Sequence, residues 1–259
     1  MRAHPSFMTM RVFALLAVLF PLSVHAACPE HFAGGVPPSS TMPVVELCSQ
    51  IFAVGYAPAD HEALWSAEHL TAVSIAQAEH LHGRGQFHED LRLPVEQRSE
   101  PYDYKRSGWS RGHLTPSGDA PTRASREETF ALSNIVPQAT RLNEGAWSHI
   151  EINVRQLARQ AGEVHVVTGP AFREGMGRIG ADHVRVPSSL WKAVYVPSRH
   201  AVAVIVCKNI KPFVCNAVGL ESLSRVTGID PFPGVPAENR KRMAQLERKL
   251  LSSITRHKD

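Results

Sequence analysis

The 259-residue sequence lacks several patterns that mark large protein classes. Its four cysteines form no CxxC pair, which argues against zinc ribbons and thioredoxin-like redox sites. Its 14 histidines show no HExxH-like arrangement, the usual zinc site of metalloproteases. No internal repeat or long low-complexity tract is visible, so neither a solenoid nor a disordered chain is expected. With 43% apolar residues the chain can bury a full core, and one domain is expected.

The N-terminal apolar run is too short to span a membrane. It covers residues 12–24, about 13 residues, whereas a spanning helix needs about 20. Arg2 and Arg11 supply positive charge, and small residues surround Ala26, so residues 1–26 are predicted to be a removable secretory signal. A lipoprotein signal would need Leu where His25 stands. We therefore expect a secreted or periplasmic protein, with an N-terminal loop segment at 27–50 and a single domain at 51–259.

Export favours disulfides over free thiols, because the compartment outside the cytoplasm is oxidising. Four cysteines allow three connectivities. The pairing of Cys28 with Cys48 and of Cys207 with Cys215 closes the shortest loops and is preferred.

The charge of the sequence is weakly basic but unevenly distributed. The formal charge is +4, and loss of Arg2 and Arg11 with the signal leaves +2. Such a small excess proves no nucleic-acid partner. A local cluster of basic residues could hold a polyanion through its phosphates, or be an ordinary solvated face. The cluster comprises Arg84, Arg92, Arg98, Lys105, Arg106, Arg111, Arg123 and Arg126.

The hydrophobic patterns predict an α+β fold with a mixed, largely antiparallel sheet core and flanking helices. Strands are expected at 51–56, 63–70, 112–114, 129–136, 164–168, 191–196 and 201–207. Helices are expected at 73–81, 143–161, 218–226 and 237–254, and loops at 27–48 and 82–108. The near-continuous apolar strands indicate a sheet covered on both faces. The helix expected at 237–254 has an apolar stripe of Met243, Leu246, Leu250 and Ile254, which is typical of core packing. No membrane anchor is therefore expected.

Polar residues within and beside these elements have the chemistry needed to cleave a phosphodiester. An imidazole with a pKa of about 6.5 can take a proton from water, and His113 is a candidate base. A guanidinium matches phosphate geometry, and Arg111 stands two residues before it. Asn143, 30 residues after His113, offers an amide oxygen to a hard cation such as Mg²⁺. Glu151 follows two helical turns later and can orient metal-bound water.

Three motifs in this order resemble the DNA/RNA non-specific endonuclease family, which carries a ββα-metal finger. They are Arg111-Gly-His113, Leu132-Ser-Asn-Ile-Val-Pro-Gln138 and Leu142-Asn-Glu-Gly-Ala-Trp147 with Glu151. The resemblance extends to Arg84-Gly-Gln-Phe-His-Glu-Asp90, Val166-Val-Thr-Gly-Pro170, Val186-Pro-Ser-Ser-Leu-Trp-Lys192 and Thr227-Gly-Ile-Asp230, and so covers most of residues 50–232.

The resemblance implies a role for each matching residue. His113 corresponds to the general base, and Asn143 corresponds to the Mg²⁺ ligand, with Mn²⁺ as a substitute ion. Glu151 matches the helix glutamate, Arg84 the upstream phosphate-stabilising arginine, and Arg111 the finger arginine, which either contacts phosphate or braces the loop. Asn134 and Gln138 match two further family positions near the site, where they either bind substrate or support the site by hydrogen bonding. The implied substrates are DNA and RNA, cleaved to 5′-phosphate products.

One position departs from the family pattern. The family usually has Asp before Arg-Gly-His, and this chain has Ser110. If that Asp only ties down the loop, Ser110 can partly replace it by hydrogen bonding. If the Asp matters more, the chain is a catalytically weakened nucleic-acid-binding protein. A phosphodiesterase acting on small extracellular substrates is a further alternative.

Overall fold

A central eight-stranded sheet organises the computed structural model, which describes residues 27–252. Its path is β12-β11-β10-β7-β4-β3-β2, and β14 pairs with β11 beside β12. Only the β11–β14 pair is parallel within this sheet of the described chain. The strands are β2 (Val45–Cys48), β3 (Phe52–Ala57), β4 (Glu62–Thr71), β7 (Glu163–Ala171), β10 (Ser189–Val196), β11 (Ala201–Lys208), β12 (Cys215–Val218) and β14 (Lys241–Arg242).

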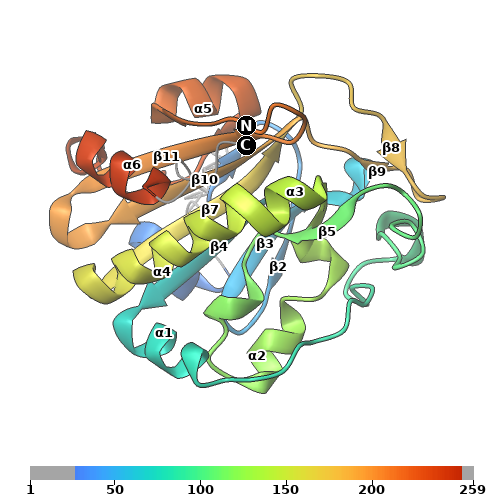
Figure 1. Ribbon diagram of the computed structural model, residues 1–259, viewed down its shortest axis with the longest axis horizontal. Coiled ribbons are helices and arrows are strands. Elements are labelled where there is room, and N and C mark those ends of the chain that lie inside the picture. Colours follow the sequence, from blue (N-terminus) through green and yellow to red (C-terminus); the bar gives the residue numbers. More distant parts are fainter. Residues whose placement is uncertain (1–26, 253–259) are drawn as a thin grey trace, which may run out of the picture.

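Helices and loops cover both faces of the sheet, as the apolar strands require. On one face lie α1 (Ala72–Glu79), α4 (Ser148–Ala161) and α6 (Ala244–Leu251), with α4 crossing in front of β4 and β7 (Figure 1). On the other face, α5 (Leu220–Thr227) packs with the N-terminal segment around Phe32. The expected α+β architecture with a largely antiparallel sheet is confirmed.

Three two-stranded ribbons complete the strands. They are β1 (Ser39–Ser40) with β13 (Ile229–Asp230), β5 (Ser110–His113) with β6 (Ile135–Gln138), and β8 (Arg178–Ile179) with β9 (Val184–Arg185). Of two short helices, α2 (Arg123–Glu128) lies between β5 and β6 in the sequence, and α3 (Thr140–Leu142) follows β6. Within residues 27–252, no helix is both long and apolar enough to cross a lipid bilayer. The expected signal, residues 1–26, lies outside the described residues.

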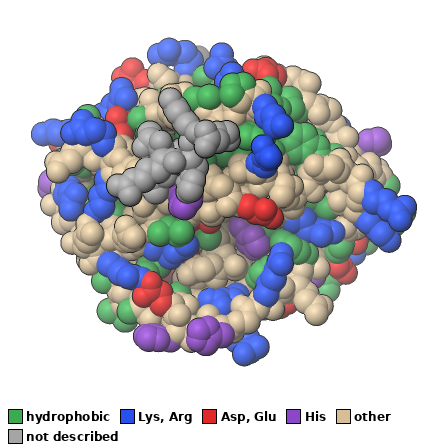
Figure 2. Space-filling view, viewed as in Figure 1, with side chains coloured by type: hydrophobic (Ala, Val, Ile, Leu, Met, Phe, Trp, Pro, Cys, Tyr) green, Lys and Arg blue, Asp and Glu red, His purple; other side chains and the backbone are tan. Residues whose placement is uncertain are grey.

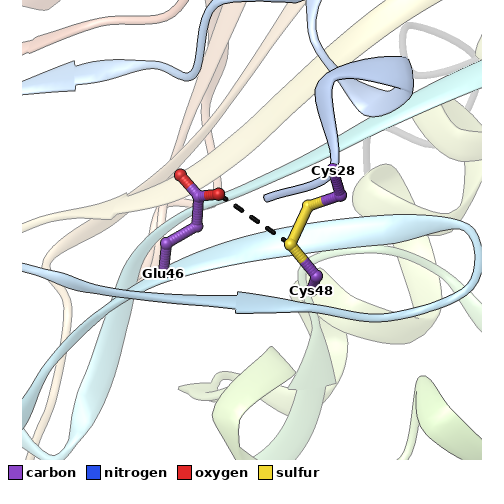
Figure 3. A group of neighbouring side chains, drawn as sticks. All are labelled: Cys28, Glu46 and Cys48. Atoms are coloured by element: carbon purple, nitrogen blue, oxygen red, sulfur yellow. Dashed lines mark hydrogen bonds between the residues drawn. A yellow bond between two sulfur atoms is a disulfide. The ribbon is translucent and has the colours of Figure 1, made fainter. Parts of the chain in front are cut away.

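Both preferred disulfides are present. Cys28 joins Cys48, with 6.0 Å between the Cα atoms, and Cys207 joins Cys215 across the β11–β12 pair. Figure 3 shows the first bridge fastening the N-terminal segment to the end of β2, with the carboxylate of Glu46 beside it. The bridge therefore anchors the chain that covers the second sheet face.

The segment expected as a loop at 27–48 contains a strand of the main sheet. β2 pairs with β3 from Val45 opposite Tyr56 to Cys48 opposite Ala53. The strand β7 also runs further than expected, through Gly169 and Pro170 to Ala171. A Cβ at Gly169 would lie 2.6 Å from the Trp191 ring, so the glycine makes room for a neighbouring side chain rather than ending the strand.

Three other boundaries differ from the sequence predictions. The strand expected at 129–136 is shorter and later, at Ile135–Gln138, because Leu132–Asn134 forms a single 3-10 turn, in which the buried Asn134 side chain bonds to the backbone of Thr115 and Thr129. The helix expected from Asn143 begins at Thr140. The helix expected at 237–254 begins only at Ala244, because the backbone of β14 pairs with β11 instead. Residue 254, the last in its expected apolar stripe, is outside the described range.

Candidate active site

The β5–β6 ribbon and α4 form a ββα finger on the sheet face that α4 covers. In the ribbon, His113 lies opposite Ile135 and Arg111 lies opposite Pro137. Side chains two residues apart on a strand share a face, so Arg111 and His113 project together. Gly112 lies between them, and a Cβ there would be 2.1 Å from the Gln138 Oε1 atom. The glycine thus allows close packing behind the two functional candidates.

Aromatic side chains surround the His113 imidazole. The ring centroids of Phe87 and Phe130 lie 5.4 and 4.7 Å from that of His113. The His113 Nε2 atom is buried and has no hydrogen-bond partner in the described chain. Burial, helped by the positive charge of Arg84, lowers the pKa of His113 to about 3. The imidazole is therefore neutral at pH 7 and has a lone pair available for a proton.

Two arginines meet at the Phe87 ring. The guanidinium carbons of Arg84 and Arg111 lie 5.7 and 5.3 Å from its centroid. Arg111 is also held by its Nη2 atom, which donates to the Pro101 carbonyl at 2.8 Å, and it lies over the Tyr104 ring. Arg84 is exposed. The structure thus brings Arg84, Arg111 and His113 together, with Arg111 braced and Arg84 free to reach a ligand.

Asn143 lies at an irregular part of the finger helix. A π-helical segment, Asn143–Trp147, joins α3 to α4, and Gly145 within it has non-helical angles of φ −109° and ψ −111°. Such π-turns are frequent at functional sites. The Asn143 side chain is half-buried, and no hydrogen bond joins it to another described residue. The amide oxygen is therefore available to a ligand.

Glu151, in the first turn of α4, is half-buried above a cluster of buried charges. Burial raises the pKa of its carboxyl to about 7, although Lys192 and Arg155 act in the opposite direction. Lys192 is 1% exposed, and its Nζ atom donates to the Thr168 Oγ1 atom at 2.5 Å. Arg155 donates to Asp119 at 2.8 Å. Glu151 and Arg155 both belong to α4, the helix of the finger, so the helix joins this cluster to the site.

The two expected substrate-binding residues are buried. Asn134 and Gln138 are both 0% exposed. The Asn134 amide makes four hydrogen bonds, accepting from Ser66 and Thr115 and donating to the carbonyls of Thr115 and Thr129. The Gln138 amide has no hydrogen-bond partner in the described chain. This burial argues against direct substrate contact and supports the alternative supporting role for Asn134.

The sequence profile of the family described as DNA/RNA non-specific endonuclease matches residues 34–238 of this chain. The chain belongs to this family. It is 34% identical to the mitochondrial nuclease EXOG of Xenopus laevis over 204 residues, which cover 70% of this chain and 56% of that protein. It is also 34% identical to nuclease C1 of Cunninghamella echinulata var. echinulata over 158 residues, covering 56% of this chain and 63% of that protein.

A solved structure shares the fold. A chain in the crystal structure of the EndoG/EndoGI complex, described as showing the mechanism of EndoG inhibition, superposes with a TM-score of 0.69 at 27% identity. The match covers 78% of this chain and 91% of that one. The chain spans little more than half the length of the curated relatives it matches.

Ser110 departs from the usual residue of this endonuclease family but still forms a link within the finger. Its Oγ atom lies 2.8 Å from the Thr140 Oγ1 atom in a hydrogen bond. Thr140 is the first residue of α3, three residues before Asn143. Ser110 thus ties the strand that carries His113 to the helix that leads to Asn143.

Sequence reasoning assigned no role to four residues around the site. Phe87 and Phe130 enclose His113, and the charged Glu68 and Lys192 are each 1% exposed on β4 and β10. A usable signal was present for Lys192, because it interrupts the apolar run of β10. Charges in such positions are uncommon unless they are paired or functional.

The basic cluster expected to hold a polyanion is partly committed to internal contacts. Arg92 pairs with Asp90, Arg98 pairs with Glu100, and Arg126 donates to the carbonyl groups of the segment that ends α1. Figure 2 shows Lys and Arg side chains spread over the α4 face among acidic and histidine side chains. Beside the finger, Arg84 and Arg123 line one small pocket together with Arg126. The basic residues beside the finger are therefore a small local group and not part of a broad basic surface.

Proposed function

We propose that this protein is a metal-dependent endonuclease that hydrolyses phosphodiester bonds of DNA and RNA and leaves 5′-phosphate ends. The observation that carries the proposal is the buried, unpartnered Nε2 atom of His113 next to the exposed Arg84. A neutral base beside a fixed positive charge suits attack by water on an anionic diester. Family membership supports the same reaction.

His113 acts as the general base. Its low pKa keeps the imidazole unprotonated at neutral pH, so it can accept a proton from the attacking water. The aromatic rings of Phe87 and Phe130 fix the plane of the imidazole. The approach of a phosphate brings negative charge beside the ring and favours the protonated form, which strengthens the base when substrate binds.

The two arginines at Phe87 have different tasks. Arg84 is exposed and neutralises the scissile phosphate as negative charge develops. Arg111 is held by the Pro101 carbonyl and by two aromatic rings, so it keeps the finger in place and contributes positive charge from a fixed position.

The oxygen donors of the finger helix fit a hard divalent cation. Asn143 offers an amide oxygen without a competing hydrogen bond, and the Glu151 carboxyl lies further along the same helical segment. Such donors suit Mg²⁺, with Mn²⁺ as a substitute. When bound, the ion supplies positive charge that stabilises the leaving oxygen. Glu151 orients water on the protein side of that site.

The remaining parts of the proposal concern substrate range and location. Cleavage directed at the phosphate backbone needs no base-reading element, which agrees with the lack of sequence preference implied by the family name. Two disulfides favour an oxidising compartment, and residues 1–26 have the composition of a secretory signal. We therefore propose secretion or export to the periplasm, although the animal relative is named as mitochondrial.

The decisive experiment is digestion of supercoiled plasmid and of single-stranded RNA by the purified protein. With Mg²⁺, nicked and linear plasmid should appear before small fragments, and RNA should be degraded. EDTA should stop both reactions. His113→Ala should lower the rate by roughly 100- to 10,000-fold, the usual contribution of a general base.

Other outcomes would redirect the assignment. Salt-sensitive DNA binding without Mg²⁺-dependent products would indicate a binding protein. Hydrolysis of a chromogenic diester with intact plasmid would indicate a small-molecule phosphodiesterase. Full activity of the His113→Ala variant would remove His113 as the base while leaving the nuclease assignment in place.

A further inference from the structure

A second group of metal-ligating side chains lies on the sheet face opposite α4. His69 on β4 stands directly across from His165 on β7, and Glu163 lies two residues before His165 on the same strand. Their neighbours on this face, Ala67 and Val167, belong to the core cluster that α5 covers. Val164 and Val166 point instead into the cluster beneath α4. The sheet therefore separates this group from the finger.

The three side chains are already close to one another. One ligand atom from each of His69, Glu163 and His165 lies within 4.8 Å of the other two. The His69 Nε2 atom is 2.7 Å from the Glu163 Oε2 atom. The two imidazole rings stack with centroids 4.2 Å apart and an interplanar angle of 9°. Tyr195 lies directly across from His165 on β10, and its ring stacks against the His165 ring on the side away from His69 in the sheet.

One ring nitrogen of His165 is not used by any hydrogen bond within the described chain. That nitrogen, the Nδ1 atom, is buried. A buried polar atom without a partner is uncommon and calls for a reason.

We propose that His69, Glu163 and His165 form a binding site for a divalent transition-metal ion, with Zn²⁺ as the best-fitting ion. Two imidazoles and one carboxylate are a ligand set that zinc uses with water in the fourth position. Imidazole ligands distinguish this site from the oxygen donors of the finger, which suit Mg²⁺. The Glu163 side chain is 46% exposed and the His69 side chain 27% exposed, which gives the ion a path from solvent.

Binding requires a small rearrangement. Ligand atoms about 2.0–2.1 Å from a tetrahedral ion lie about 3.4 Å from one another. The 2.7 Å between the His69 Nε2 and Glu163 Oε2 atoms therefore widens by roughly 0.7 Å, while His165, within 4.8 Å of both, adjusts to the same spacing. The parallel rings turn about their Cβ–Cγ bonds so that both lone pairs point at the ion. When zinc binds the Nε2 atom, the His69 ring takes the tautomer that carries its single proton on Nδ1, so the ring stays neutral and the Glu163 oxygen is released to the ion. The backbone pairing of β4 and β7 stays as it is.

The described chain contains one other group of closely spaced metal-ligating residue types, and that group is not a metal site. Cys28, Glu46 and Cys48 also lie close together, but the two sulfur atoms form a disulfide (Figure 3). A disulfide offers no thiolate to a metal. The histidine group is thus the one whose ligand atoms are chemically ready.

The test is equilibrium dialysis of the full chain against Zn²⁺, with bound metal measured by plasma emission, followed by titration calorimetry. Glu163→Gln is the main variant, because its exposed side chain makes loss of folding improbable and its amide keeps a hydrogen bond to His69. His165→Asn removes the buried ligand. His80→Gln, at an exposed histidine elsewhere, is the matched control. Asn143→Ala separates zinc bound at the finger from zinc bound here.

The wild type, His80→Gln and Asn143→Ala should each bind one zinc ion. Glu163→Gln should bind that ion at least about tenfold more weakly, and His165→Asn should not bind it. Zinc should raise the Tm of the wild type and of the control by more than that of Glu163→Gln. Mg²⁺-dependent nuclease activity should stay within about twofold of the wild type in Glu163→Gln, which shows that the variant is folded.

Equal zinc affinity and stoichiometry in the wild type, Glu163→Gln and His165→Asn would overturn the site. Loss of all bound zinc in Asn143→Ala would do so as well, because the ion would then belong to the finger. These results bear on the histidine group alone and leave the nuclease proposal unaffected.

Discussion

Two asparagines of the finger, nine residues apart, have opposite surroundings. Asn134 is fully buried, and its amide makes four hydrogen bonds to three residues. Asn143 is half-buried, and its amide is bonded to no other described residue. Both belong to the motifs that mark the family. The difference shows that a motif position identifies a residue as necessary without saying whether it supports the fold or meets a ligand.

Whether a side chain already has all its hydrogen-bond partners separates a residue that supports the fold from one that meets a ligand. A buried amide that has every partner stabilises one arrangement of the chain, because breaking any bond leaves a buried group unpaired. An accessible amide without partners loses nothing when an ion or substrate arrives. By the same criterion His113, whose Nε2 atom has no partner within the described chain, belongs with Asn143 among the residues that can meet a ligand.

The largest expected effect comes from replacing each asparagine in turn. Asn143→Ala should lower kcat for plasmid cleavage by roughly 100-fold or more, because the metal's contribution is several kcal/mol, and should change Tm by no more than about 2 °C. Asn134→Ala should lower Tm by roughly 10 °C, because each buried group left unpaired costs roughly 1–3 kcal/mol. Thermal unfolding and plasmid digestion at a temperature where both variants are folded measure the two effects.

The informative control is the Mg²⁺ dependence of the activity that remains. Only Asn143→Ala should need more Mg²⁺ for half-maximal rate. A normal Mg²⁺ requirement in Asn143→Ala, or a stable but inactive Asn134→Ala, would show that hydrogen-bond satisfaction does not separate the roles.

The comparison extends to two titratable groups whose pKa values move in opposite directions. The folded chain raises the pKa of Glu151 from 4.5 to about 7, so its stabilising contribution is complete below pH 4.5 and is lost as pH rises to about 7. It lowers the pKa of His113 from 6.5 to about 3, so that contribution is complete above pH 6.5 and is lost as pH falls to about 3. In metal-free protein the two slopes oppose each other between pH 4.5 and 6.5.

Removing either group should expose the slope of the other. In EDTA, the Tm of Glu151→Gln should rise between pH 4.5 and 6.5 by roughly 5 °C more than that of the wild type. The Tm of His113→Gln should fall relative to the wild type over the same range. Calorimetric scans at four pH values measure these slopes. Parallel curves for all three proteins would mean that neither group is buried in the folded chain as strongly as the structure indicates.

How far the sequence predicts the fold depends on which interaction decides each element. The strands β10 and β11 and the helix α4 follow from apolar periodicity, because burial alone determines them. The interpretation fails at 129–136, where side-chain hydrogen bonds of Asn134 accompany a 3-10 turn at Leu132–Asn134, and at 241–242, where pairing with β11 extends a segment of helical composition. Those elements depend on local hydrogen bonds and distant partners that periodicity does not record.

The candidate site shows the same limit. The order and spacing of the motifs predict His113, Asn143 and Arg84 as candidate site residues, because the proposed chemistry requires those residue types. The enclosure of His113 by Phe87 and Phe130 depends on the path of residues 82–108, a segment with little periodic pattern. The burial of Asn134 and Gln138 likewise depends on how the ribbon packs against β4. Sequence patterns therefore select the reacting groups but not their environment.

The smallest expected effect tests whether the hydrogen-bonded Ser110 helps to position Asn143, whose side chain has no hydrogen bond to another described residue. Ser110 bonds to Thr140 and so links the β5 strand to the helix that leads to Asn143. Loss of one hydrogen bond worth about 1 kcal/mol should lower kcat/KM by roughly fivefold in Ser110→Ala. Thr140→Val removes the same bond from the other side and should have a similar effect. Ser110→Asp keeps an acceptor for the Thr140 hydroxyl and should stay within about threefold of the wild type.

The double variant decides whether these effects share one cause. If the bond alone matters, Ser110→Ala combined with Thr140→Val should be no worse than either single variant, because the second change removes nothing further. Additive losses would mean that each hydroxyl acts on something else, such as substrate. A gain of tenfold or more in Ser110→Asp would show that the usual acidic residue contributes charge, in which case the serine limits the activity of this chain rather than merely replacing a brace.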